Sequence, residues 1–164
     1  MDAPNNIIML TGPEPELGKS FVSVNLGAVL AQAGERVLVV DGDMRRGHIH
    51  KMLGSGSRSP GLSDLLSGTA TLEQCIRSTE VDQLFVIPTG AIPPNPSELL
   101  VHQRFVALLG ELSAIFDHVI IDTPPALAVT DASIIGRHAG ITLVVLKAGR
   151  HPLRMIEDLI NRLN

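Results

Sequence analysis

The chain has 164 residues, of which 45% are hydrophobic, and it carries a formal net charge of -4 at pH 7. This length fits one compact domain with a sizeable core, so we expect residues 1–164 to form a single domain. The acidic balance disfavours nucleic acid as a partner, and no apolar run approaches the ~18 residues of a membrane span.

The first predicted strand, residues 7–10, runs into a loop that ends in Gly18-Lys19-Ser20 and continues directly as an amphipathic helix. Backbone N–H groups and the helix dipole at such a junction favour an anion, which is how a phosphate-binding loop holds a nucleotide. Lys19 would reach the β- and γ-phosphates, and the Ser20 hydroxyl would bind Mg²⁺. We therefore expect ATP to contact six consecutive residues: Glu16, Leu17, Gly18, Lys19, Ser20 and Phe21.

The helix after this loop is predicted from Val22 to Ala33, and Gly34 supplies its stop. A second apolar strand follows at residues 37–40. A strand, a helix and a strand within this length predict a βαβ unit, which makes the sheet parallel.

Polar residues dominate the next stretch, 44–61, which we expect to be a mobile surface connection that serves as a lid or an interaction loop. Arg45 and Arg46 are suited to steer an acidic, phosphorylatable segment, or are simply solvated. His48 and His50 have no Cys or carboxylate at ligand spacing, so we interpret them as surface histidines rather than metal ligands.

The remaining pattern alternates helices with apolar strands. In chain order it predicts helices at 62–66 and 72–77, a strand at 84–87, a proline-stiffened loop that enters a helix with its apolar face between Leu99 and Leu112, a strand at 119–121, a helix at 131–138, a strand at 141–146 and a helix at 153–163. The single cysteine, Cys75, lies in an apolar context and is interpreted as a small buried side chain.

Three carboxylates come directly after predicted strands: Asp41 and Asp43 after residues 37–40, and Asp122 after residues 119–121. Ligands bind beyond the carboxyl ends of parallel strands, so we expect these carboxylates and the loop to meet at one Mg-nucleotide. Asp122 has the placement of a Walker B aspartate, which holds Mg²⁺ directly or through water. Asp41 and Asp43 are two residues apart and would point to the same side, where one of them orients or deprotonates the attacking nucleophile.

Each of these motifs has a simpler interpretation. Pro13 stands where the pattern G-x-x-x-x-G-K-[ST] has its first glycine, so the loop is a variant, and an ordinary strand-to-helix turn is the alternative. Aspartates at strand ends also cap the turns that follow them.

Four stretches together resemble the kinase domain of the bacterial tyrosine kinases that govern capsule and exopolysaccharide synthesis: residues 18–20, 39–46, 93–100 and 120–125. The nucleotide motifs alone also suit the wider MinD/ParA-like group of P-loop ATPases, whereas Pro-Asn-Pro-Ser-Glu-Leu-Leu at 94–100 is more specific to the polysaccharide kinases. The resemblance implies a P-loop NTPase with a doubly wound, mostly parallel sheet in a three-layer α/β fold. It also implies an autokinase that transfers phosphate from ATP to tyrosine.

The same resemblance implies the site and its surroundings. Lys19, Asp41 and Asp43 would be catalytic, and Ser20, Asp43 and Asp122 would hold Mg²⁺. The domain would be a fragment of a longer bacterial inner-membrane protein, on its cytoplasmic side. Its partners would be the tyrosine-rich C-terminal tails of neighbouring subunits in a homo-oligomer, and the machinery of polysaccharide synthesis and export.

Two competing functions stay open on the sequence. One is a MinD/ParA-type ATPase switch, in which water rather than tyrosine accepts the phosphoryl group; the other is a nucleotide-binding interaction module without turnover. Glu14 occupies the position of the signature lysine of the MinD/ParA group, which argues against a lysine-bridged nucleotide dimer.

Overall fold

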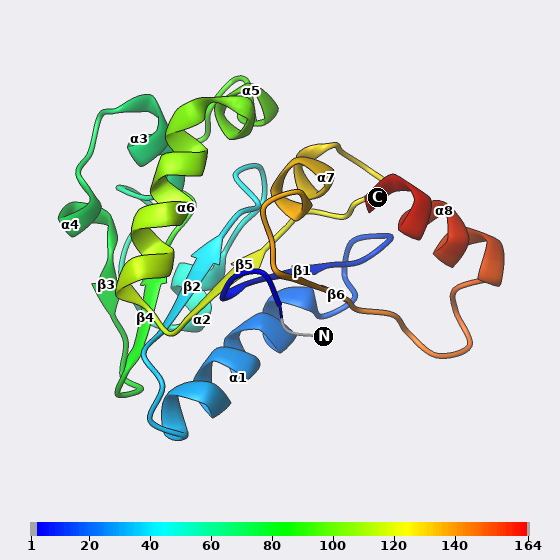
Figure 1. Ribbon diagram of the computed structural model, residues 1–164, viewed down its shortest axis with the longest axis horizontal. Helices are drawn as coiled ribbons and strands as arrows, with labels where there is room; N and C mark the ends of the chain where they lie inside the picture. Colours follow the sequence, from blue (N-terminus) through cyan, green and yellow to red (C-terminus); the bar gives the residue numbers. More distant parts are fainter. Residues whose placement is uncertain (1–2, 164) are drawn as a thin grey trace.

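The computed structural model describes residues 3–163, which form one mixed sheet between helices (Figure 1). In chain order the elements are β1 (Ile7–Thr11), α1 (Lys19–Gln32), β2 (Val37–Asp41), α2 (Ile49–Met52), α3 (Leu62–Ser67), α4 (Leu72–Cys75), β3 (Arg77–Ser78), β4 (Leu84–Ile87), α5 (Pro96–Val101), α6 (Gln103–Ile115), β5 (His118–Asp122), α7 (Asp131–Gly136), β6 (Ile141–Val144) and α8 (Leu153–Leu163).

The strands lie in the order β3-β4-β2-β5-β1-β6, and all neighbours are parallel except β3, which pairs antiparallel with β4. The chain therefore leaves β1, passes over β5 through α1 to reach β2, and later returns to the other side of β1. The expected doubly wound, mostly parallel sheet is confirmed.

Successive side chains along each strand point to opposite faces of the sheet, so each face has its own hydrophobic core. Val37, Val39 and Ile120 face α1 and belong to one cluster, whereas Leu38 and Ile121 pack with α6 in the other. Figure 1 shows α1 and α6 on opposite sides of the strands. The result is the expected three-layer arrangement, and both layers of helices are needed because the central strands are apolar on both sides.

The carboxyl ends of the central strands meet at one edge. Asp41 and Asp122 are the last residues of β2 and β5 and are register partners, and Leu10 of β1 pairs with Asp122 on the other side. The loop after β1 thus begins beside both carboxylates. This edge is where a parallel sheet binds ligands.

The stretch 44–61, predicted as a surface connection, is buried at its start and exposed over most of residues 51–59. Met44 and Ile49 are fully buried, Ile49 of α2 packs in the same core cluster as Val39 and Leu84, and His50, expected on the surface, is also buried. The Arg77 guanidinium donates to the carbonyl oxygens of Ser55 at 2.9 Å and Pro60 at 2.9 Å. Backbone carbonyls in this stretch are thus bound by the half-buried Arg77 guanidinium, which ties the segment to the domain.

Two element boundaries also differ from the prediction. The helix predicted to end at Arg77 ends at Cys75, and Arg77 instead begins the short antiparallel strand β3. The apolar face between Leu99 and Leu112 is divided between α5 and α6, because His102 takes an extended backbone conformation and its Nδ1 accepts the N–H of Arg104 at 3.2 Å. A side-chain cap at His102 starts a new helix there.

Candidate active site

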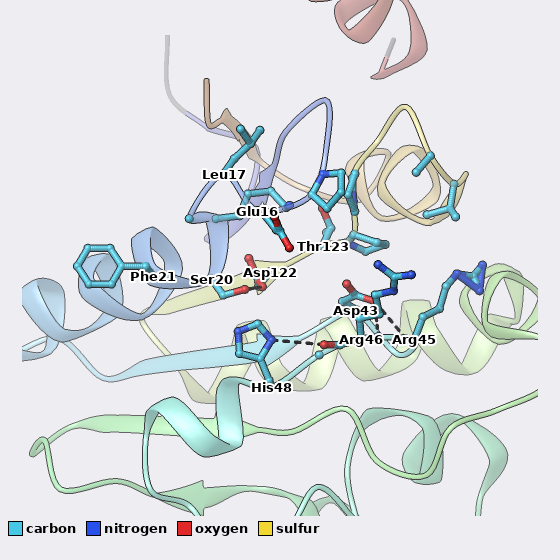
Figure 2. Close-up of a pocket in the computed structure, with 18 of the residues that line it drawn as sticks. Glu16, Leu17, Ser20, Phe21, Asp43, Arg45, Arg46, His48, Asp122 and Thr123 are labelled. Carbon is cyan, nitrogen blue, oxygen red and sulfur yellow. Dashed lines mark hydrogen bonds between the residues drawn. The ribbon is translucent and has the colours of Figure 1, made fainter. Parts of the chain in front are cut away.

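A cavity of about 730 Å³ opens at the carboxyl edge of the sheet (Figure 2). Its walls come from the loop 15–21, from the segment after β2 (Asp43, 45–48 and Met52) and from the segment after β5 (122–125, Ala128 and Val129). All six residues predicted to contact ATP, 16–21, line this cavity. Asp43 and Asp122 line it as well, so the structure brings together two of the three strand-end carboxylates with the loop.

The loop enters α1 through a glycine that its backbone requires. Gly18 has φ of +81°, the left-handed region that side chains disfavour, and no atom lies within 4 Å of the position of a Cβ. Conformation rather than crowding therefore selects glycine there. Lys19 follows as the first residue of α1; burial lowers its pKa, while the carboxylates of Asp122 and Asp43 raise it. A cation thus sits beside two carboxylates at the helix N-terminus.

The Asp122 carboxylate accepts two hydroxyls from α1. Ser20 Oγ donates to Oδ2 at 2.6 Å, and Ser23 Oγ donates to Oδ1 at 2.9 Å. Burial raises the pKa of Asp122, while the two hydrogen bonds oppose this by stabilising the ionised form. Ser23 was not predicted, although its spacing of three residues from Ser20 on a helix places both hydroxyls on one face.

The oxygen atoms of Ser20, Asp122 and Asp43 suit Mg²⁺, which prefers hard oxygen ligands and retains waters and substrate phosphates in its shell. Within residues 3–163 no three His, Cys, Asp or Glu side chains lie together as a metal cluster. Two carboxylates and a hydroxyl are the smaller set expected when phosphates complete the coordination.

The structure separates Asp41 from Asp43, which we predicted to point to the same side. Asp41 is the last residue of β2, so its side chain takes the face of Val39, is fully buried, and accepts the Ile49 N–H at 2.9 Å. Asp43 lies past Gly42 in the turn and lines the cavity, where its Oδ1 accepts the N–H groups of Arg45 at 3.2 Å and Arg46 at 2.9 Å. One oxygen of Asp43 thus caps the turn after β2, which was the simpler interpretation of a strand-end aspartate.

Burial raises the pKa of Asp41 to about 8. Its Oδ1 has no hydrogen-bond partner among the described residues, and the side chain does not line the cavity. Asp41 is thus placed behind the site, where it supports the segment that carries Asp43.

The structure also shows what other residues of the motif stretches contact. Thr123 lines the cavity and donates its hydroxyl to the carbonyl oxygen of Leu10 at 2.8 Å, which ties the end of β5 to β1. The Asn95 side chain donates to the Glu98 carboxylate in the first turn of α5, and neither lines the cavity. His48 lines the cavity and is exposed, as expected of a surface histidine.

Glu14 is held by the connection between β6 and α8. Its Oε1 lies 2.8 Å from Arg150 Nε and 3.1 Å from His151 Nε2, and the His151 side chain is almost fully buried. The position of the MinD/ParA signature lysine therefore carries an acidic side chain engaged within its own chain.

A protein-family model described as an AAA domain matches residues 6–164. The tyrosine-protein kinase wzc of Salmonella typhimurium is 48% identical over 162 residues, which cover 99% of this chain and 22% of that protein. The chain thus spans about a fifth of the length of this curated relative.

Solved structures of tyrosine-kinase domains are also similar to this chain. The kinase domain of the Escherichia coli tyrosine kinase ETK is 42% identical with a TM-score of 0.94, over 99% of this chain and 64% of that one. The VpsO kinase domain is 33% identical with a TM-score of 0.92, over 97% of this chain and 78% of that one. The septum site-determining protein MinD of Pyrococcus horikoshii, solved with Mg-ADP, is 21% identical with a TM-score of 0.68 over 94% of this chain and 77% of that one, and shares the fold.

Proposed function

We propose, because this chain belongs to the AAA-domain family and within it to the bacterial tyrosine-kinase domains, that it transfers the γ-phosphoryl group of ATP to tyrosine hydroxyls. One observation supports this most directly: the 2.6 Å contact between Ser20 and Asp122, beside Lys19 and Asp43 in one cavity. Oxygen ligands for Mg²⁺ and a cation for the phosphates are the parts that phosphoryl transfer needs.

In this proposal residues 16–21 hold the triphosphate, with Lys19 against the β- and γ-phosphates. Ser20, Asp122 and Asp43 would hold Mg²⁺, which when bound neutralises phosphate charge. Asp43 orients the tyrosine hydroxyl or takes its proton. We assign this role to Asp43 rather than to Asp41 because Asp43 lines the cavity and Asp41 does not. Asp41 contributes to transfer by holding the segment 43–49 through the Ile49 N–H.

We further infer the setting from the relatives. The chain would be one domain of a longer bacterial inner-membrane protein, on its cytoplasmic side, and a homo-oligomer would present tyrosine-rich tails to neighbouring subunits. The machinery of polysaccharide synthesis and export would be its partner. Among residues 3–163 we find no helix with the length and apolarity that a bilayer span requires.

The absence of tyrosine from the sequence gives the test. The chain has no Tyr, so it offers no tyrosine acceptor of its own. Incubated with Mg-ATP, it should keep its intact mass, while a supplied tyrosine-rich peptide should gain phosphate. Labelling should be slow, because a free peptide lacks the effective concentration of a tethered one.

Intact mass spectrometry of chain and peptide, with release of inorganic phosphate measured in parallel, separates the alternatives. Phosphate release without peptide labelling would instead identify an ATPase switch. Tight ATP binding without either product would identify a binding module. Phosphate on Ser or Thr of the chain, with none on the peptide, would overturn the tyrosine assignment.

A further inference from the structure

Arg45 lines the cavity and is anchored from two other elements. Its Nη2 lies 3.2 Å from Asp131 Oδ1, at the start of α7, and 3.3 Å from Ser97 Oγ, in the first turn of α5. Ser97 Oγ also donates to Asp131 Oδ1 at 2.6 Å, which closes a triangle of three side chains. One hydroxyl and one carboxylate therefore fix the position of a guanidinium that would otherwise move with its loop.

The anchor is a buried carboxylate, which makes a purely structural role a poor explanation. The Asp131 side chain is fully buried, and its Oδ2 has no hydrogen-bond partner among the described residues. Burying a charge with incomplete partners is destabilising relative to an apolar residue of the same size. The triangle thus costs stability, and what it secures is the orientation of Arg45.

Arg45 lines the same cavity as the loop 16–21 but comes from the segment after β2. In the view of Figure 2, Ser20 and Phe21 lie on one side of Asp43 and Arg45 lies on the other, with Arg46 beneath Asp43. In phosphoryl transfer the attacking and leaving oxygens are roughly in line, so the acceptor approaches from the side opposite the leaving ADP. With the nucleotide on the loop 16–21 and Asp43 acting on the tyrosine hydroxyl, as proposed above, a bound acceptor would lie beside Asp43 and therefore near Arg45, whose backbone N–H donates to Asp43 Oδ1.

The positive charges of two adjacent arginines beside Asp43 suit an acidic ligand. A guanidinium has N–H donors in a planar fork that fits a carboxylate. In Arg45 the triangle takes Nη2 and Nε is buried without a partner among the described residues, which leaves Nη1 for a ligand. Arg46 is exposed beside it and adds a second positive charge.

We propose that Ser97 and Asp131 are positioning residues that hold Arg45 so that it binds acidic side chains flanking the accepted tyrosine. This rests on the proposed kinase function and deepens it by naming the substrate class, a tyrosine peptide with neighbouring carboxylates. It also gives a role to the Pro-Asn-Pro-Ser-Glu-Leu-Leu stretch, whose Ser97 reaches the cavity wall through Arg45.

The test compares two peptides that differ only in whether the residues flanking one tyrosine are Glu or Gln. Binding is measured by fluorescence anisotropy with Phe in place of the tyrosine and a non-hydrolysable ATP analogue with Mg²⁺ present, and transfer is measured with the tyrosine versions. The variants are Ser97→Ala and Asp131→Asn, with Ser97→Thr as the conservative rescue. Asp117→Asn is the matched control, because its carboxylate caps the Arg36 N–H at the opposite end of β5.

The chain and the control should bind the Glu peptide about three- to tenfold more tightly than the Gln peptide, as expected for charge-assisted hydrogen bonds. Ser97→Ala and Asp131→Asn should lose most of this preference through a higher KM for the Glu peptide, with kcat at saturating peptide and the affinity for Mg-ATP unchanged. Ser97→Thr should restore it. If Asp131→Asn does not fold, Ser97→Ala carries the comparison.

Three results would overturn the inference: no preference in the unmodified chain, a preference retained in Ser97→Ala, or weaker Mg-ATP binding with the peptide preference intact, which would assign Arg45 to the nucleotide. The binding measurements need no phosphoryl transfer. A preference for the Glu peptide without any transfer would therefore contradict the proposed kinase function and leave the role of Ser97 and Asp131 standing.

Discussion

At the residue scale, two serines share the Asp122 carboxylate but should differ in what they do. Ser20→Ala removes a proposed Mg²⁺ ligand, so nucleotide affinity should fall about tenfold or more in the presence of Mg²⁺ and change little in its absence. Titration calorimetry with and without Mg²⁺ measures this. Equal affinities for the variant and the unmodified chain under both conditions would remove Ser20 from the metal site.

Ser23→Ala is the matched comparison. It leaves Asp122 Oδ1 without its buried donor, which should lower the free energy of unfolding by about 1–3 kcal/mol. The Mg²⁺ dependence of nucleotide binding should persist, because Ser20 remains. Urea unfolding and the same calorimetry distinguish a support for the carboxylate from a metal ligand.

Asp41 gives the domain a pH dependence of stability. Burial raises its pKa to about 8, above the value of about 4 in an unfolded chain. The folded state keeps a proton that the unfolded state releases between these values, so this contribution to stability is present below about pH 4 and is lost as pH rises through about 8. The free energy of unfolding should therefore fall as pH rises within that window, by roughly 1 kcal/mol per pH unit.

Asp41→Asn cannot ionise and should therefore flatten this dependence. Urea unfolding between about pH 5 and pH 8 gives the comparison, and parallel slopes for the variant and the unmodified chain would show that Asp41 is not protonated in the fold. Single-turnover transfer should fall more in Asp43→Asn than in Asp41→Asn, because only Asp43 lines the cavity.

How far the sequence predicts the site depends on how local its signals are. The loop residues and Asp122 follow from short motifs, and the structure gathers them in one cavity. The partners of Arg45 lie 52 and 86 residues away, at Ser97 and Asp131, and no spacing rule connects them. Asp41 and Asp43 were predicted as a pair because strand geometry was extended past residue 41, where Gly42 in fact ends it.

At the element scale, the turn after β2 depends on a glycine with no room for a side chain. A Cβ on Gly47 would overlap Asp41 Oδ1 and Thr89 Cγ2, and both of these side chains are fully buried. Gly47→Ala should therefore lower the free energy of unfolding by about 1–3 kcal/mol.

Gly110→Ala is the control, because Gly110 lies in α6 with nothing within 4 Å of a Cβ. Alanine has the higher helix propensity, so this variant should be stabilised by up to about 1 kcal/mol. Chemical denaturation of both variants is the measurement, and a loss of stability at Gly110 equal to that at Gly47 would contradict the packing argument.

The elements themselves were predictable where one face or both faces of a segment are apolar. Strands β1, β2, β4 and β5 have such patterns, since burial dictates residue type along them. The apolar positions predicted for α1 are not its buried face: Val22 and Val29 are exposed, and the buried residues are Lys19, Ser23, Gly27 and Ala31. Strand β3 has two residues, too few for a period. The segment 44–61 is polar in composition, and besides the buried Met44 and Ile49 its backbone is held by hydrogen bonds from Arg58 to the Met44 carbonyl and from Arg77 to the Ser55 carbonyl. The break at His102 depends on a single side-chain hydrogen bond, which periodicity does not reveal.

At the scale of the whole molecule, one thiol reports on global unfolding. Cys75 is the only cysteine, is fully buried in the core shared by α3 and α6, and burial raises its pKa to about 11. A thiol reagent should therefore react only when the domain opens. Mg-ATP at about one hundred times its dissociation constant should slow the labelling about one hundredfold if opening is global, because ligand binding stabilises the folded state.

A mass-spectrometric time course of labelling at increasing Mg-ATP gives this measurement, with urea as the positive control for exposure. Labelling that is fast in native buffer and independent of nucleotide would show that Cys75 opens locally, in the layer of α3 and α4, without the cavity.

Phe21, drawn at the cavity wall in Figure 2 and 63% exposed, is a suitable position for a fluorescent reporter of binding. The chain contains neither Trp nor Tyr, so its own near-ultraviolet emission is weak. Phe21→Trp would introduce a sole indole on the second residue after Lys19, where a nucleotide bound on the loop 16–21 would change its emission. In the unmodified chain, which has neither Trp nor Tyr, a tyrosine peptide could be followed by the emission of its own phenol, so that binding and phosphorylation are measured in one sample.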